Sequence, residues 1–144
     1  MTLDPAAASA PIDAAFEAFE HRRGRSPDGV WCAPGRVNLM GEHTDYNGGR
    51  CLPIALESVT AAAASLRDDG VVTAESLQTD IGFTGRIDDL APERISGWPA
   101  YAVGVVWALR EAGLEVPGVD LVVSGSVPVG AGLSSSASLE CSVA

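Results

Sequence analysis

Hydrophobic and polar positions along the chain follow two periods, and the longer period predicts helices. In residues 11–23, apolar side chains recur at i, i+3, i+4 and i+7, which is the spacing of one helix face. Residues 98–112 carry a second stripe of this kind, with Pro99 in its first turn and Gly113 directly after it. We therefore expect two amphipathic helices, over residues 11–23 and 98–112.

Shorter apolar runs predict strands. Residues 30–33 and 119–123 are such runs, and residues 51–66 form a longer run that is rich in alanine. The alanines favour a helix by their intrinsic propensity. The β-branched pair at 59–60 and the Asp-Asp-Gly turn signal at 68–70 favour a strand, and a strand is our prediction for residues 51–66.

Strands and helices alternate along the chain, which predicts an α+β (mixed α/β) fold. No internal repeat or linker divides the chain, so we expect one domain over residues 1–144. Gly- and charge-rich residues 34–50 predict a loop, and a Gly/Ser-rich loop follows over 125–136. A last helix that begins near Leu133 would reach Ala144 without a capping signal, so we expect the natural protein to be longer.

The balance of charge narrows the class of partner. The 144 residues include 19 acidic and nine basic ones, for a formal net charge of −10, and every basic residue is an arginine. Proteins that bind nucleic acid or an anionic membrane surface carry basic patches, so we expect neither partner. With 47% hydrophobic residues, the chain can still bury a core.

Cysteine usage and the N-terminus predict a cytoplasmic protein. Cys32, Cys51 and Cys141 form no C-x-x-C pair, and their odd number disfavours a disulfide framework or a zinc ribbon. Residues 1–10 are small and alanine-rich without a basic start, unlike a secretory signal peptide. No run approaches the ~18 apolar residues of a membrane-spanning helix.

One polar segment, residues 33–49, has the side chains that a sugar site needs. Its polar members are Arg36, Asn38, Glu42, His43, Asp45 and Asn47. Binding a ring of hydroxyls takes carboxylate acceptors together with His, Asn or Arg donors in one small volume. A solvated turn is the alternative for any of these residues alone. A metal site made by Glu42, His43 and Asp45 is another, although their spacing lacks the i, i+4 geometry of helical zinc ligands.

A second segment, residues 127–140, has the features of a phosphate-binding loop. It follows a strand and opens a helix, and its glycines let successive backbone N–H groups point toward an anion. Its serine hydroxyls can bind phosphate oxygens or Mg²⁺. It is not a Walker A loop, because that motif needs a lysine. A flexible Gly/Ser linker is the alternative, which the apolar residues on both sides disfavour.

Both segments closely resemble galactokinases of the GHMP kinase superfamily. Residues 35–47 match the galactokinase signature nearly position for position, with Met40 where isoleucine is usual, and residues 128–138 match the superfamily's phosphate-binding motif. The likeness covers most of the chain from about Val30 onward. It implies a GHMP kinase N-terminal domain, ribosomal protein S5 domain 2-like, that is incomplete at its C-terminal end and lacks the C-terminal GHMP domain.

The resemblance also implies a reaction and a role for each motif. Galactokinases phosphorylate galactose at its anomeric hydroxyl, with ATP as co-substrate and Mg²⁺. By this match Arg36 lies near the reacting groups, and Ser136 is a Mg²⁺ ligand. The implied galactose-binding residues are Glu42, His43, Thr44 and Asp45. The implied ATP-binding residues are Gly130, Ala131, Gly132, Leu133, Ser134, Ser135, Ser136, Ala137 and Ser138. Trp98 would lie beside the nucleotide base, or else be a core residue of its helix.

The same resemblance places further parts of the machinery beyond Ala144. Family members use a carboxylate base and a carboxylate on Mg²⁺ that follow the phosphate loop, so we expect the 144-residue chain alone to be inactive. The full-length protein is expected to be a monomer. Alternatives are a kinase of N-acetylgalactosamine or arabinose, a non-catalytic galactose/ATP sensor, and another GHMP kinase such as mevalonate or homoserine kinase. The polar residues 42–45 speak against the last, whose substrates offer no ring of hydroxyls.

Overall fold

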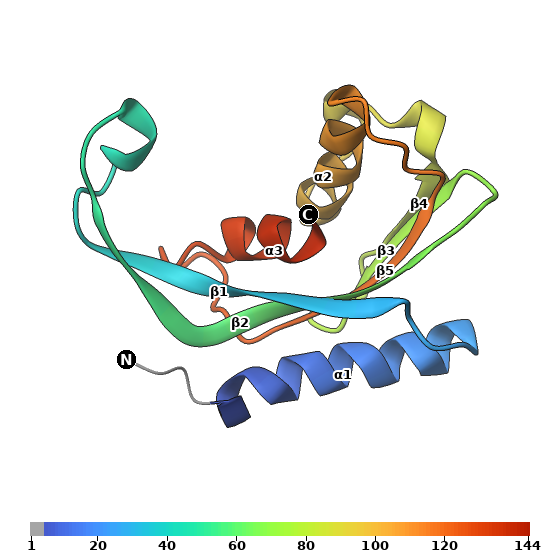
Figure 1. Cartoon of the computed structure of the whole chain (residues 1–144), viewed down its shortest axis with the longest axis horizontal. Coiled ribbons are helices and arrows are strands. Elements are labelled where there is room, and N and C mark those ends of the chain that lie inside the picture. Colours follow the sequence, from blue (N-terminus) through green and yellow to red (C-terminus); the bar gives the residue numbers. More distant parts are fainter. Residues whose placement is uncertain (1–4) are drawn as a thin grey trace.

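The computed structural model describes residues 5–144, except for the side chains of residues 5–8, 45 and 92. A five-stranded mixed sheet carries helices on both faces (Figure 1). The strand order is β1-β2-β5-β3-β4, in which β3 and β5 are parallel and all other neighbours antiparallel. The predicted α+β class is thereby confirmed. The main elements are α1 (Pro5–Arg23), β1 (Gly29–Met40), β2 (Leu52–Leu66), β3 (Val71–Ser76), β4 (Phe83–Arg86), α2 (Pro99–Glu111), β5 (Val119–Gly125) and α3 (Ser135–Val143).

The alanine-rich run forms a strand that helices cover on both faces of the sheet. Ala61 and Ala63 of β2 pack with Phe19 of α1, whereas Ala62 belongs to the core on the other face, with Val103 of α2. All five residues are fully buried. Successive residues of a strand point to opposite faces, so a strand buried on both faces shows no alternation of hydrophobic and polar residues.

Strand β1 is longer than the sequence predicts. It continues through Pro34 to Met40, across most of the segment expected to be a loop, because β2 pairs with it along nearly its whole length. In the resulting long hairpin, β1 ends just before Gly41, whose φ is +90°. A Cβ there would lie 2.5 Å from the carbonyl oxygen of Arg50, so only glycine fits the turn. A 3₁₀ turn, Asp45–Asn47, forms the hairpin tip.

The helices agree with the sequence analysis in position and differ at their ends. Helix α1 begins at Pro5, before the predicted start, and keeps Pro11 inside it. The alanines between these prolines have high helix propensity, which accounts for the extension. Helix α2 begins at Pro99 with Trp98 as its N-cap. Strand β4 was not predicted. Over residues 5–144, no helix is both long and apolar enough to cross a bilayer.

A cluster of arginines surrounds one buried carboxylate where α1, the β2–β3 turn and β5 meet. Asp120 is 1% exposed and accepts hydrogen bonds from Arg67 (2.9 Å), Arg25 (3.1 Å) and Thr73 (2.6 Å). Nε of Arg23 lies 3.3 Å from the same carboxylate. Burial alone would raise the pKa of Asp120, but the hydrogen bonds from Thr73 and Arg67 and the charges of Arg23 and Arg67 outweigh it and lower the pKa. We call these five residues the arginine cluster.

Candidate functional site

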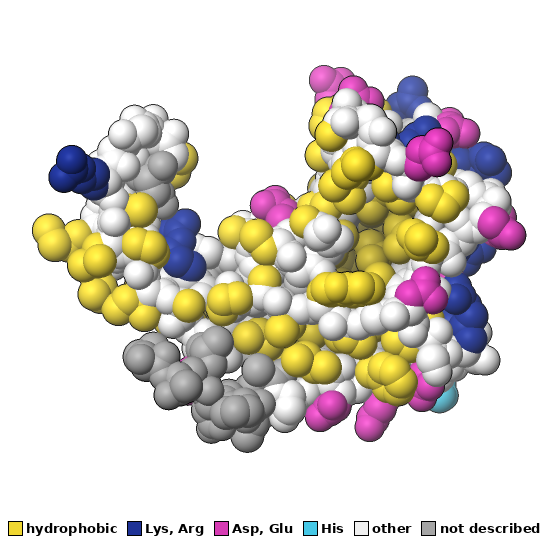
Figure 2. All heavy atoms as spheres, in the orientation of Figure 1, with side chains coloured by type: hydrophobic (Ala, Val, Ile, Leu, Met, Phe, Trp, Pro, Cys, Tyr) yellow, Lys and Arg dark blue, Asp and Glu magenta, His cyan; other side chains and the backbone are white. Residues whose placement is uncertain are grey.

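An open cavity of about 590 Å³ lies between the hairpin tip and the helices α2 and α3. Figure 2 shows the surface hollowed between the projecting β1–β2 hairpin and the helical side of the molecule. The lining residues are Arg36, Glu42, His43, Tyr46, Trp98, Tyr101, Val129, Gly130, Gly132, Leu133, Ser134, Ser135, Ser136 and Leu139. Both segments singled out in the sequence therefore contribute to one cavity.

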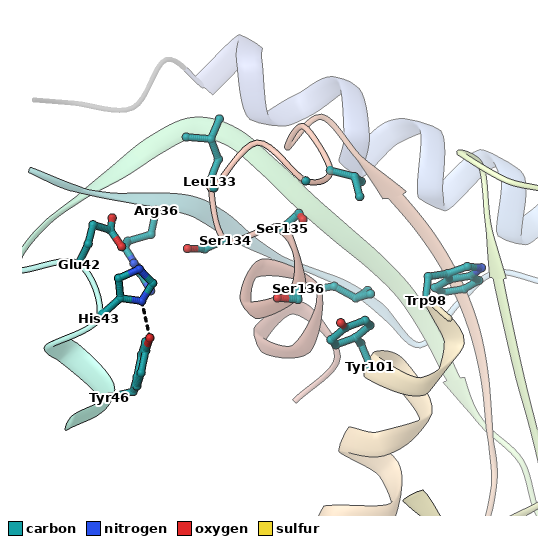
Figure 3. Close-up of a pocket in the computed structure, with 14 residues that line it drawn as sticks. Arg36, Glu42, His43, Tyr46, Trp98, Tyr101, Leu133, Ser134, Ser135 and Ser136 are labelled. Atoms are coloured by element: carbon teal, nitrogen blue, oxygen red, sulfur yellow. Dashed lines mark hydrogen bonds between the residues drawn. The ribbon is translucent and has the colours of Figure 1, made fainter. Parts of the chain in front are cut away.

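Four separate parts of the chain supply the lining side chains (Figure 3). Arg36 comes from β1, and Glu42 and His43 come from the hairpin tip. The serines come from the loop before α3 and from the first turn of that helix, and Tyr101 comes from α2. Arg36, Glu42 and His43 gather on one side of the serines in the close-up, and Trp98 and Tyr101 lie on the other.

The hairpin tip holds His43 by several local contacts. The backbone of His43 is in the left-handed region, with φ of +66°, which is uncommon for a residue other than glycine. The side-chain amide of Asn47 donates to the His43 carbonyl at 2.6 Å, and a hydrogen bond joins Nδ1 of His43 to the Tyr46 hydroxyl. The two rings meet edge to face, with centroids 5.9 Å apart. Strained backbone held in this way is common at binding sites.

Thr44 is placed differently from its neighbours. Its hydroxyl donates to the carbonyl oxygens of Gly41 (2.7 Å) and Arg50 (3.0 Å), and the residue does not line the cavity. The hydroxyl therefore closes the turn at the hairpin tip. The Asp45 side chain, predicted from the sequence to bind galactose, lies outside the described residues.

The Gly/Ser loop is attached to the sheet at both of its ends. The backbone N–H of Ser126 donates to the Val59 carbonyl of β2 (2.9 Å), and that of Arg36 in β1 donates to the Leu133 carbonyl (3.1 Å). Between these anchors Gly130 and Gly132 have positive φ. Directly after the second anchor, Ser134, the N-cap of α3, has φ of +59°. The loop thus presents the N-terminus of a nine-residue helix to the cavity. Unpaired N–H groups and the helix dipole make such an end suited to an anion.

The serines of this loop divide into two groups. Ser134, Ser135 and Ser136 line the cavity. Ser138 is 2% exposed, and its hydroxyl donates to the Ala33 carbonyl of β1 at 2.7 Å. Ser138 therefore joins α3 to the sheet. Ala131 and Ala137, also assigned to ATP by the sequence, are exposed and do not line the cavity.

The aromatic residues at the start of α2 combine packing with exposure. Trp98 packs against the apolar core, donates from Nε1 to the Ile81 carbonyl (2.7 Å) and also lines the cavity. Both interpretations of Trp98 are thus compatible with its position. Tyr101 and Tyr46 also line the cavity, and sequence reasoning did not single them out. Tyr101 falls on the apolar stripe that the sequence predicts over residues 98–112, yet it is 46% exposed.

The described residues offer little to a metal ion by themselves. No group of three His, Cys, Asp or Glu among them is arranged to hold one. Glu42 and His43 line the cavity. The third member of the metal site considered from the sequence is Asp45, whose side chain lies outside the described residues. Mg²⁺ is commonly held by only one or two protein ligands plus substrate phosphates. The Ser136 hydroxyl at the helix end is compatible with that kind of site.

Two family models match the chain in the regions that build the cavity. The galactokinase galactose-binding signature matches residues 17–66, which include the hairpin tip. The GHMP kinases N terminal domain matches residues 100–144, which include the Gly/Ser loop and α3.

Similar proteins include galactokinases and, more distantly, another kinase. The chain is 53% identical to a galactokinase of Streptomyces coelicolor over 125 residues, which are 86% of this chain and 32% of that protein. The crystal structure of Lactococcus lactis galactokinase complexed with galactose matches with a TM-score of 0.77 and 37% identity, over 91% of this chain and 35% of the other. A mevalonate kinase of Methanococcus jannaschii shares the fold, with a TM-score of 0.68 at 18% identity over 80% of this chain and 38% of the other. The chain spans about a third of the length of these relatives, and over most of its own length it is similar to galactokinases, with matches to a galactokinase signature and to the GHMP kinase N-terminal domain.

Proposed function

We propose that the protein containing this chain transfers the γ-phosphoryl group of ATP to the anomeric hydroxyl of galactose. The observation that carries the proposal is the shared cavity, which brings the galactose-binding signature and a helix N-terminus suited to phosphate to one place, with Arg36 beside them. The relatives named galactokinase support the same reaction. Because the chain spans a third of their length, the proposal concerns the whole protein.

On the sugar side, we assign hydroxyl recognition to Glu42, His43 and Asp45. A carboxylate accepts hydrogen bonds from hydroxyls, and His43, which lines the cavity with one ring nitrogen engaged by Tyr46, has a second ring nitrogen that can bond a hydroxyl. Asp45 is assigned on the resemblance alone. A site that pairs an axial hydroxyl leaves a polar group unpaired when a sugar lacks that hydroxyl, which can cost ~10⁴-fold in specificity.

On the phosphate side, we assign the triphosphate to the loop and the N-terminus of α3. Residues 134–136 line the cavity with their backbone N–H groups and hydroxyls available to an anion, and Arg36 adds a positive charge. In the transfer the bond from the γ-phosphorus to the bridging oxygen of ADP breaks, a bond to the anomeric oxygen forms, and the hydroxyl proton leaves to a base. When bound beside Ser136, Mg²⁺ would neutralise charge on the phosphates. The chain's own part is to hold both reactants in line and to stabilise the charge that develops.

A reducing compartment such as the cytoplasm fits this proposal. Cys32, Cys51 and Cys141 are all exposed and none forms a disulfide in the described structure. Exposed thiols of this kind persist where the surroundings keep them reduced.

The proposal can be tested by turnover and by binding. The chain would be assayed alone and as a chimera that replaces the matching third of the Streptomyces coelicolor galactokinase. We expect the chimera to release ADP in a galactose-dependent way, with galactose preferred over glucose, N-acetylgalactosamine and arabinose. Asp45→Ala should weaken galactose binding far more than ATP binding. A well-folded chimera that binds neither galactose nor ATP would contradict the proposal.

A further inference from the structure

We propose that Gly35 is a positioning residue that sets the spacing between the sugar-binding strand and the phosphate loop. The inference rests on the proposed function, because it concerns how the two reactants are held relative to each other. Gly35 lies in β1, immediately before Arg36, and is buried under the end of the loop.

The loop approaches Gly35 too closely for any side chain. A Cβ on this residue would lie 2.9 Å from the backbone oxygen of Leu133, 3.0 Å from Cγ1 of Val127 and 3.3 Å from Cδ1 of Leu56. The first of these atoms belongs to the backbone, so it can yield only if the loop itself moves. The φ of Gly35 is outside the left-handed region, so space and not torsion calls for glycine here.

This close approach makes a hydrogen bond possible. With the loop lying directly on Gly35, the Arg36 N–H donates to the Leu133 carbonyl at 3.1 Å. The pairing of β1 with β2 is interrupted at the same point, because residues 56–58 of β2 lie opposite Gly35 alone. Such irregularities often occur beside functional sites, where they redirect a strand. At this irregularity the Gly/Ser loop lies against β1.

One backbone contact therefore joins the two halves of the cavity. On one side of it, Arg36 carries its guanidinium into the sugar side of the cavity. On the other side, Leu133 is followed by the left-handed Ser134 and then by Ser135, the first residue of α3. Because only Ser134 separates Leu133 from α3, we expect a shift of Leu133 to displace the helix N-terminus relative to Arg36. A misplacement of ~1 Å between reacting groups can cost 10²-fold in rate.

Gly35→Ala is the direct test, with Gly104→Ala as the matched control. Gly104 lies in α2, has no atom within 4 Å of its added Cβ and has no positive φ, so the same methyl group should be harmless there. In the active chimera we expect Gly35→Ala to lower kcat by ~100-fold while the KM for galactose and for ATP each change less than threefold. A purely structural role would lower the melting temperature and leave kcat per folded molecule intact. An unchanged kcat would overturn the inference, as would an equal loss in Gly104→Ala.

A second measurement needs no substitution and stands if Gly35→Ala fails to fold. The Arg36 amide of the unsubstituted protein should exchange its hydrogen slowly, and more slowly still with a non-hydrolysable ATP analogue bound, because the bound phosphates then hold the loop more firmly against β1. Exchange at the rate of an unprotected amide would overturn the inference. Absence of galactose-dependent turnover in the unsubstituted chimera would instead count against the proposed function, so the two failures are distinguishable.

Discussion

The arginine cluster and the cavity differ in how their polar groups are exposed and paired. In the cluster, a carboxylate that is 1% exposed is surrounded by three guanidinium groups, two from the C-terminal end of α1 and the residues directly after it, and one from the turn after β2. In the cavity, Glu42 and His43 are exposed, and the backbone is strained at His43 and Ser134. Buried, mutually paired charges fix a structure, whereas exposed polar groups on strained backbone are ready to meet a ligand.

Removing the buried carboxylate should give the largest effect on stability. Asp120→Ala leaves three arginines without their shared partner, and breaking a buried ion pair in this way costs about 3–5 kcal/mol. Urea denaturation would measure the loss. Asp88→Ala is the control, because the Asp88–Arg110 pair is exposed and should contribute less than ~1 kcal/mol. Equal losses in the two variants would contradict the difference that we draw between buried and exposed pairs.

Acid should act on the same cluster. The pKa of Asp120 is lowered in the folded protein, and so is that of Asp69, a carboxylate outside the cluster whose hydrogen bond from Arg67 lowers its pKa to about 2. A lowered pKa adds stability above the unfolded value, near 4, and this stability is lost as the pH falls through the folded value. We expect the free energy of unfolding to drop below about pH 4, and to drop less steeply in Asp120→Ala.

Substitution in the cavity should lower activity rather than stability. Arg36→Ala removes a charge from the proposed transfer site, and loss of one such group lowers kcat by ~10²–10³-fold. Its free energy of unfolding should change by less than ~1 kcal/mol, because Arg36 is not part of the buried cluster. Steady-state kinetics of the chimera would give the result, with the exposed Arg94→Ala as control. A large loss of stability with kcat intact would reverse the assignment.

The sequence predicted local structure and the cavity motifs better than it predicted the contacts between distant segments. The alanine run of β2 was correctly predicted as a strand from its β-branched start and the following turn. The extension of β1 past Pro34 was missed, because proline and glycine suggest a loop and only the pairing with β2 overrides them. The arginine cluster was not predicted, because Arg25 and Asp120 are 95 residues apart and no local sequence pattern indicates their pairing.

Candidate site residues were predicted as a set, but not their separate tasks. The motif resemblance indicated both segments of the cavity, yet it could not tell that the Thr44 hydroxyl is taken up by the hairpin turn. Tyr46 was passed over because a tyrosine within a polar loop carries no signal of its own. Its contact with His43 depends on the 3₁₀ turn at the hairpin tip.

Ser138 and Ser136 belong to one motif, yet the structure gives the first a structural role and places the second in the cavity. Ser138→Ala leaves the buried Ala33 carbonyl without its donor, which should lower the free energy of unfolding by about 1–3 kcal/mol. Ser136→Ala should leave stability within ~0.5 kcal/mol, because Ser136 is exposed, and should raise the Mg·ATP concentration needed for turnover. Thermal unfolding and ATP titration would separate the two. Matching effects from both serines would mean that the motif does not divide as the structure suggests.

The smallest expected effect concerns Tyr46, where the substitution removes a single oxygen. Tyr46→Phe keeps the edge-to-face ring contact and loses only the hydrogen bond to Nδ1 of His43. A net hydrogen bond is worth about 0.5–1.5 kcal/mol, so the galactose KM should rise roughly two- to tenfold while the ATP KM and kcat stay unchanged. Isothermal titration with galactose would give the same shift in Kd. If ATP binding weakened instead, the hairpin tip would belong to the phosphate side of the cavity, and the assignment of His43 to the sugar would be wrong.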